Sequence, residues 1–231
     1  MPDFKRVGQS MTSPTSNSRR MEVRVPPYVD EKGYIQNGGL IFKPVPALHE
    51  GPITGPHAVV LHRPVTRSAN GTLASFARGI GTHFVVDLDG TIYQAASLKS
   101  YTSHVGPILP RCLAEGSCSP EETKLLAKLG PMPGHRHEKL KDYPLRYPMN
   151  SDSVGIEVVG TYSYDAKQWD AATDAQKKAV SSLIGILKRE YSLTDADVYE
   201  HDKISRKTPG EGAGIYDGDS RLPGRFPPRF I

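Results

Sequence analysis

Two histidines follow short apolar segments at widely separated places in the sequence. His62 ends the segment His57–His62, which predicts a buried strand, and His201 directly follows Asp197–Glu200, which predicts another. Histidines at the ends of two strands can meet at one edge of a sheet, where neutral imidazole is a good zinc ligand. The chain holds eight histidines, so this pair alone does not establish a metal site.

A single carboxylate interrupts the apolar segment Val154–Gly160, which predicts a third buried strand. Burial disfavours the charged form of a carboxyl group, so the pKa of Glu157 should rise toward the range that suits a general base. We therefore take Glu157 as a candidate base. The alternative is a buried ion pair, for instance with Lys207.

Other local signals outline the elements that must position these side chains. A turn at Asp87–Gly90 separates two short apolar runs and predicts an antiparallel hairpin. Asp87 and Asp89 resemble a catalytic pair of carboxylates, but aspartates are common in such turns, so no catalytic role is needed to explain them. A capping box, Thr173 to Gln176, opens the clearest helix, whose apolar stripe has helical spacing. A short helix is predicted over Thr72–Arg78, before Gly79.

The chain of 231 residues predicts one domain with decorations. Residues 1–24 are almost free of apolar side chains and predict a disordered leader, so the domain should span 25–231. Residues 25–56 are rich in Pro and Gly and predict an extended wrap with short strands. Residues 107–150 predict a long, mostly irregular insertion with one short helix over Glu121–Leu129.

The insertion holds the two cysteines and a histidine pair. Cys112 and Cys118 have five residues between them, and a local disulfide, which indicates an oxidising compartment, explains them more simply than a zinc knuckle. His135 and His137 could bind a metal if they lay on one side of a strand, but their setting among prolines favours surface residues.

Composition excludes some classes of protein. No apolar run is long enough to span a membrane, and the first twenty residues show no apolar core of a secretory signal, so export would need another route. The net charge of +4 is mildly basic, but Lys and Arg are scattered and are not interleaved with aromatic residues. We therefore expect no nucleic-acid partner.

Five stretches, in order over residues 57–217, together resemble the zinc-dependent N-acetylmuramoyl-L-alanine amidases, which share a fold with peptidoglycan recognition proteins. They are VVLHRP, GTHFVVDLDGTIYQ, SHVG, NSDSVGIEVVG and EHDKISRKTPGEG. The resemblance implies an α/β fold, with a central mixed sheet flanked by helices. It also implies a Zn²⁺ ion held by His62, His201 and a third ligand beyond His201.

The third ligand departs from the family pattern. The family usually places Cys or Asp eight to ten residues after the second histidine; here Pro209 stands at eight and Glu211 at ten. Pro209 has no ligand atom, so we expect Glu211, with Asp202 a poorer candidate. By the same resemblance Glu157 is the base and Lys207 the cation that stabilises the oxyanion, with Lys203 its rival.

Three further residues are expected to contact the substrate. His104 lies in the SHVG stretch and would line the cleft or make a structural hydrogen bond; Thr82 stands where some members of the family have a catalytic Tyr; and Arg63 follows His62. The resemblance implies hydrolysis of the amide between N-acetylmuramic acid and L-alanine in peptidoglycan. A non-catalytic peptidoglycan-binding protein of the same fold is the alternative.

The biological setting is a further expectation. A disulfide without a visible secretory signal suits delivery into the periplasm or outside the cell, for example as an antibacterial toxin fired by a contact-dependent machine such as a type VI secretion system. Such a toxin would have an immunity protein as its partner. A phage lysis enzyme and a recycling enzyme also fit.

Overall fold

Six strands form the central sheet of the protein, and they position the predicted chemistry. The computed structural model describes residues 25–53 and 55–218, so the predicted leader at 1–24 lies outside the described residues. The strand order is β12–β5–β9–β6–β7–β3. Their bounds are β12 (Val198–Glu200), β5 (Ala58–His62), β9 (Ser153–Val158), β6 (Phe84–Val86), β7 (Ile92–Gln94) and β3 (Ile41–Phe42). The first four are mutually parallel and β7 runs antiparallel to β6, which confirms the predicted mixed sheet and its hairpin.

The register of the parallel strands brings the predicted site together. His62 pairs with Glu157 on β9, and Leu61 pairs with Glu200 on β12. His201, the residue after Glu200, therefore comes level with His62 on the other side. Because the carboxyl ends of parallel strands lie at one sheet edge, β5 carries His62 between the other two residues.

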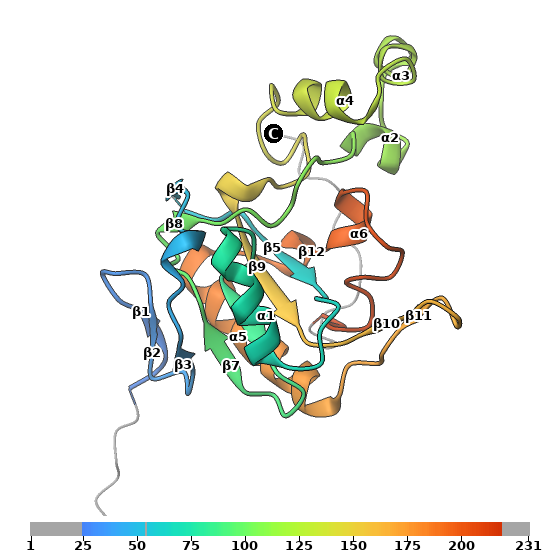
Figure 1. The fold of residues 1–231 in the computed structure, drawn as a ribbon. Helices are drawn as coiled ribbons and strands as arrows, with labels where there is room; N and C mark the ends of the chain where they lie inside the picture. The colour runs from blue at the N-terminus through green and yellow to red at the C-terminus, as the bar shows by residue number, and fades with distance from the viewer. Residues whose placement is uncertain (1–24, 54, 219–231) are drawn as a thin grey trace, which may run out of the picture.

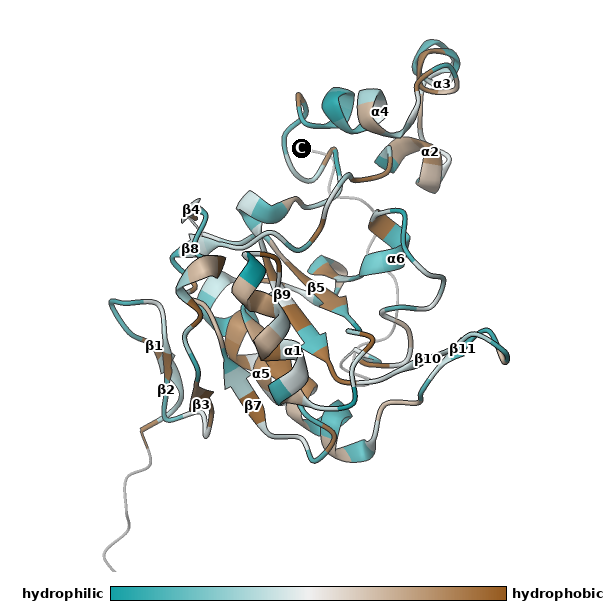
Figure 2. Ribbon diagram, viewed as in Figure 1, coloured by the Kyte–Doolittle hydropathy of each residue, from teal (hydrophilic) through white to brown (hydrophobic). Residues whose placement is uncertain are grey.

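Helix α5 (Asp174–Tyr191) covers one face of the sheet (Figure 1). It begins as predicted at Thr173, whose hydroxyl accepts the Gln176 backbone N–H while the Gln176 side chain accepts the Thr173 N–H. Its apolar stripe packs on alternate residues of β5 and β9 in the main core, brown in Figure 2. Within the described residues, no helix combines the length and apolar character that crossing a bilayer requires.

The opposite face of the sheet carries the functional residues. Since side chains alternate along a strand, the β5 and β9 residues that do not meet α5 point to this face, His62, Gly155 and Glu157 among them. Helix α1 (Ala69–Ser75), η2 (Phe76–Arg78) and α6 (His201–Ile204) lie on this side of the sheet. The first helix begins three residues before the predicted start, because Ser68 caps it by accepting the Gly71 N–H.

Short elements complete the fold. The wrap over 25–56 contains, as predicted, only short pieces: β1 (Tyr28–Val29), β2 (Ile35–Gln36), β3, η1 (Pro46–Leu48) and β4 (Gly51–Pro52). β4 pairs with β8 (Ser100–Tyr101), and β10 (Tyr162–Ser163) with β11 (Gln168–Trp169). Two 3-10 turns precede strands of the main sheet: η3 (Asn150–Asp152) before β9 and η4 (Asp195–Asp197) before β12.

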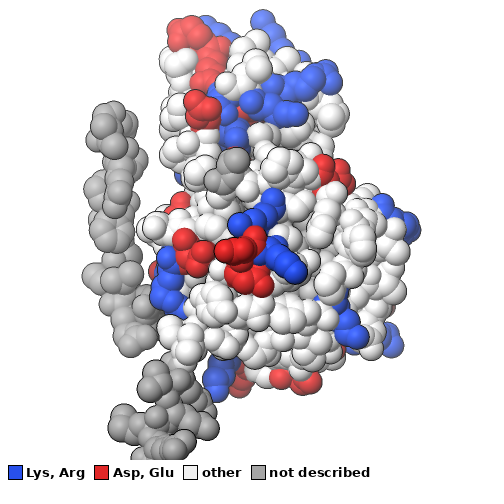
Figure 3. Space-filling view, turned by 90° about the vertical axis from the view of Figure 1, so that its left-hand side faces the viewer, with Lys and Arg blue, Asp and Glu red and all other residues white. Residues whose placement is uncertain are grey.

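The insertion is more helical than predicted. It contains α2 (Arg111–Glu115), α3 (Pro120–Leu126) and α4 (Pro131–Glu138). The predicted helix corresponds to α3, and the prediction missed α2 and α4. Pro120 and Pro131 stand in the first turn of a helix, where a missing N–H costs nothing, so these prolines do not exclude helices. Lys141 bridges Glu122 and the fully buried Glu138 at 2.5 and 2.6 Å. In Figure 3 this upper lobe shows cations and anions side by side.

Candidate functional site

His62, His201 and Glu211 converge at the edge of the sheet. The Glu211 Oε1 atom lies 2.8 Å from His201 Nδ1 and 3.7 Å from His62 Nδ1, and the two imidazole centroids are 4.1 Å apart. All three residues are buried. Each offers one ligand atom to a common point, as zinc sites require. The structure thus brings together all three predicted ligands.

The tautomer of His201 is fixed by a backbone carbonyl. His201 Nε2 lies 2.8 Å from the carbonyl oxygen of Val105, which can only accept, so Nε2 carries the proton and donates it. His201 Nδ1 then faces the Glu211 carboxylate. Ligand histidines are commonly oriented through their second nitrogen in this way. Sequence reasoning missed Val105, because a backbone carbonyl leaves no signal in residue type.

A longer chain of hydrogen bonds fixes His62. The Ser153 hydroxyl donates to the Met149 carbonyl at 2.7 Å, so its oxygen accepts from His104 Nε2 at 3.3 Å. His104 Nδ1 must then accept the proton of His62 Nε2 at 3.0 Å. Burial lowers the pKa of both His62 and His104 well below the usual value, which keeps both rings neutral. The lone pair of His62 therefore lies on Nδ1.

The chemistry of these three groups tests whether a cation fits the site. The two Nδ1 atoms and the Glu211 carboxylate face one another, with Glu211 Oε1 2.8 Å from His201 Nδ1 and 3.7 Å from His62 Nδ1. Two imidazoles and one buried carboxylate offer three ligand atoms to a cation, and this is a ligand set that zinc accepts in hydrolases. The residues therefore fit the zinc ion that the resemblance implies.

Glu157 lies beside this triad with a strongly perturbed carboxyl group. Burial and, to a smaller extent, the negative charge of Glu211 raise its pKa to about 8, against the opposing charge of Lys207. Its Oε2 atom is enclosed and has no hydrogen-bond partner in the described part of the chain. Glu157 and Lys207, both among the described residues, do not form the buried ion pair that was the alternative from the sequence. A carboxyl group of this kind can exchange a proton near neutral pH.

Lys207 and Lys203 are both exposed but face different charges. The charge of Lys207 lowers the pKa of both His62 and Glu157. Lys203 lies 4.0 and 3.5 Å from the carboxylates of Glu200 and Asp202. These electrostatic effects favour Lys207 as the cation at the site.

The loop that delivers Glu211 is held on both sides. Asp202 accepts the backbone N–H groups of Gly210 at 2.9 Å and Gly212 at 3.4 Å, so it orders the loop instead of binding metal. A Cβ on Gly212 would lie 2.6 Å from Glu200 Cα, which explains the glycine. The Arg63 guanidinium donates to the carbonyls of Asp170 and Ala213, the latter two residues beyond Glu211.

The three residues predicted to contact the substrate make hydrogen bonds within the protein. Arg63 clamps two loops, as described above. The buried Thr82 hydroxyl donates to the Phe84 carbonyl, and His104 supports His62. These are structural roles, and the predicted substrate contacts stay predictions.

The other histidines and the cysteines have roles of their own. Cys112 and Cys118 form the predicted disulfide. His135 and His137 lie on α4 rather than on a strand: His135 accepts the Ile108 N–H, and His137 lies 3.4 Å from Glu122. Lys141 already supplies a cation to the carboxylates there.

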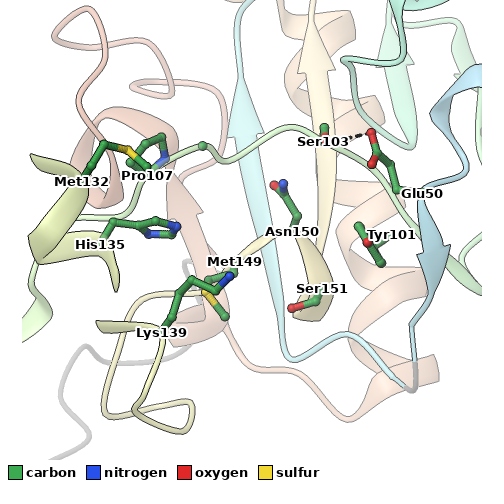
Figure 4. Close-up of a pocket in the computed structure, with 11 residues that line it drawn as sticks. Glu50, Tyr101, Ser103, Pro107, Met132, His135, Lys139, Met149, Asn150 and Ser151 are labelled. Carbon is green, nitrogen blue, oxygen red and sulfur yellow. Dashed lines mark hydrogen bonds between the residues drawn. The ribbon is translucent and has the colours of Figure 1, made fainter. Parts of the chain in front are cut away.

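A cleft of about 480 Å³ separates the insertion from the core (Figure 4). Met132, His135 and Lys139 line it from α4 and the turn after it, and Glu50, Tyr101 and Asn150 are among the residues on the core side. None of the three metal-site residues lines it. Asn150 also accepts the N–H groups of His104 and Val105, so one wall of the cleft supports the residues behind the ligands.

Comparison with known families agrees with this geometry. The model of the N-acetylmuramoyl-L-alanine amidase family matches residues 52–211, which include the three ligand candidates and Glu157. The chain belongs to this family. The match covers most of the predicted catalytic core at 57–217. No curated protein matched this amidase.

Comparison with solved structures bears on the fold. A selenomethionine derivative of AmpD has a TM-score of 0.52 at 17% identity, covering 80% of this chain and 92% of that chain. The amidase LysC from Clostridium intestinale URNW gives 0.43 at 18%, covering 74% and 89%. The peptidoglycan recognition protein PGRP-Hd from Alvinella pompejana gives 0.43 at 14%, covering 77% and 90%. The first of these confirms the predicted amidase fold for this chain.

Proposed function

We propose that this amidase is zinc-dependent and hydrolyses the peptidoglycan amide between the lactyl group of N-acetylmuramic acid and L-alanine. The observation that supports it best is the convergence of one ligand atom each from His62, His201 and Glu211, with Glu157 beside them. Family membership supports the amide as the bond that is cut. A bound zinc ion would supply Lewis acidity for the scissile carbonyl and the attacking water.

The residues of the chain supply the rest of the mechanism. Glu157 takes a proton from the attacking water and then passes it to the leaving amine nitrogen, a double role suited to a carboxyl group with a raised pKa. Lys207 places a positive charge where the carbonyl oxygen becomes negative. His104 and Val105 hold the two imidazoles through their Nε2 atoms, so that Nδ1 of each ring faces the site.

Mass spectrometry of digested muropeptides tests this proposal. The wild-type protein should release free stem peptides and leave the glycan intact, and zinc removal by a chelator should abolish release until zinc is restored. His62→Ala should abolish release because a ligand is lost. Glu157→Gln should lower kcat about 100- to 10,000-fold while zinc stays bound. Glu31→Gln, at an exposed glutamate remote from the site, is the matched control.

The outcomes separate the alternatives. Cleavage within the glycan, or full activity of Glu157→Gln, would contradict the proposed reaction. A protein that binds muropeptides and zinc but releases no peptide would be the non-catalytic binder of the same fold.

We propose further that the amidase works in the periplasm or outside the producing cell. The Cys112–Cys118 disulfide supports this, since disulfides persist in oxidising compartments. Expression directed to the periplasm of a test bacterium should cause lysis, while cytoplasmic expression should not. If the role is that of an antibacterial toxin, a protein encoded by the producer should protect against periplasmic expression, and failure to find one would count against that role.

A further inference from the structure

Three aromatic side chains form a row along one face of the β10–β11 hairpin. Tyr162 and Trp169 are register partners with ring centroids 5.3 Å apart. Tyr164, two residues beyond Tyr162, has its centroid 5.2 Å from the Tyr162 ring. Tyr162 therefore lies between the other two rings, and Tyr164 stands in the turn at the tip of the hairpin. We call Tyr162, Tyr164 and Trp169 the aromatic row.

The aromatic row starts next to the candidate metal centre. A Cβ placed on Gly210, the neighbour of Glu211, would lie 3.7 Å from the Trp169 ring. Arg63, the neighbour of His62, donates to the Asp170 carbonyl, and the Asp170 carboxylate closes the hairpin by accepting from Thr161. The hairpin is therefore fixed at its base to both ligand segments. Figure 1 shows it extending away from the sheet.

The row has the character of a binding surface and not of a core. Tyr164 is 77% exposed at the hairpin tip, although aromatic rings carry a large apolar surface. Trp169 and Tyr162 are partly exposed beside it. Aromatic side chains with one polar end are enriched where proteins bind ligands.

We propose that the aromatic row binds successive sugar rings of a glycan strand beside the scissile amide, an inference that rests on the proposed function. Pyranose rings have apolar C–H faces that pack on aromatic rings, and their hydroxyl groups remain free for hydrogen bonds at the rim. A row of rings running outward from the metal centre suits a long, repeating ligand. A stem peptide of small and charged residues has no comparable flat faces.

Fluorescence of the full-length protein tests this directly, because Trp169 is the only tryptophan in the chain. Glycan strands freed of stem peptides are not substrates of an amidase, so they can be titrated without turnover. We expect a saturable change in Trp169 emission with these strands, and none with free stem peptide. Tyr164→Ala should weaken glycan binding about tenfold, and Tyr164→Phe should retain it. Tyr28→Ala, at an exposed tyrosine on β1, is the control.

Kinetics give a second readout. Tyr164→Ala should raise KM for polymeric peptidoglycan about tenfold, and its kcat/KM on a single disaccharide-peptide unit should stay within about twofold of wild type. Unchanged glycan affinity in Tyr164→Ala, or an emission change caused by stem peptide alone, would overturn the inference. If the wild-type protein cleaves nothing, the proposed function fails, yet the glycan titration still decides whether the row binds sugars.

Discussion

At the scale of single residues, the site depends on proton positions as much as on the ligands. The Met149 carbonyl, through Ser153 and His104, sets which nitrogen of His62 carries the proton. A Cβ on Gly155 would lie 2.8 Å from His104 Nδ1, so the absence of a side chain there leaves room for this chain of hydrogen bonds. His104 is thus a positioning residue for a ligand.

Removing the His104 ring should weaken zinc binding. His104→Ala leaves His62 Nε2 without its acceptor, so the ring can rotate or move its proton to Nδ1. We expect a 10- to 100-fold loss of zinc affinity, measured by competition with a chromogenic chelator. His57→Ala, at an exposed histidine, should leave affinity unchanged. Unaltered affinity in folded His104→Ala would mean that the ligand is held by packing alone.

Glu157 should make the metal-free protein less stable as pH rises. Its folded pKa of about 8 lies above the usual value of 4.5, so between these pH values the unfolded chain has released a proton that the folded protein still holds. The contribution to stability is complete below pH 4.5 and is lost by about pH 8. Urea unfolding with a chelator present should show the advantage of wild type over Glu157→Gln shrinking over this window. A constant difference would contradict the raised pKa.

At the scale of elements, the loop carrying Glu211 and the β10–β11 hairpin are linked through Arg63. Its two terminal nitrogens donate to the carbonyls of Asp170 and Ala213. A lysine has one terminal nitrogen in place of this planar fork, so it cannot reproduce both hydrogen bonds in the same geometry. β5 ends at His62, which is one candidate ligand. Arg63, the next residue, holds the loop that carries Glu211, a second candidate ligand.

Arg63→Lys should therefore loosen both segments. We expect faster amide hydrogen exchange over residues 206–218 and in the hairpin, together with a several-fold loss of zinc affinity, while the sheet keeps its protection. Arg78→Lys, at an exposed arginine, is the matched control. Equal exchange in both variants would show that Asp202 alone orders the loop.

The elements differ in how far the sequence could predict them. β5, β9, β12 and α5 follow from local patterns, and the family motif supplied their pairing and thus the meeting of His62 with His201 and Glu157. Glu211 could be selected because Pro209 has no ligand atom. The carbonyls of Val105 and Met149 and the clamp by Arg63 depend on contacts between residues about 100 positions apart or more, or on backbone atoms, which residue type does not reveal.

At the scale of the whole molecule, the two faces of the sheet have separate tasks. One face packs against α5 in the largest apolar cluster, and the other carries the buried polar groups of the site. Even the buried His83 on that side is fully engaged: it accepts the Gly155 N–H, and its Nε2 lies 3.0 Å from the Ser100 carbonyl. Its pKa of about 4, lowered by burial, keeps it neutral.

This division predicts that stability and metal binding can be changed independently. Leu183 on α5 is fully buried in the main core, so Leu183→Ala should lower the free energy of unfolding by about 2 to 5 kcal/mol through lost burial and a cavity. Zinc affinity of the folded variant should stay within about twofold of wild type, because the ligands are oriented from the opposite face. Urea denaturation of the metal-free protein measures the first quantity, and chelator competition under native conditions the second. A parallel loss of zinc affinity would mean that packing against α5 sets the positions of His62 and Glu157 through the strands themselves.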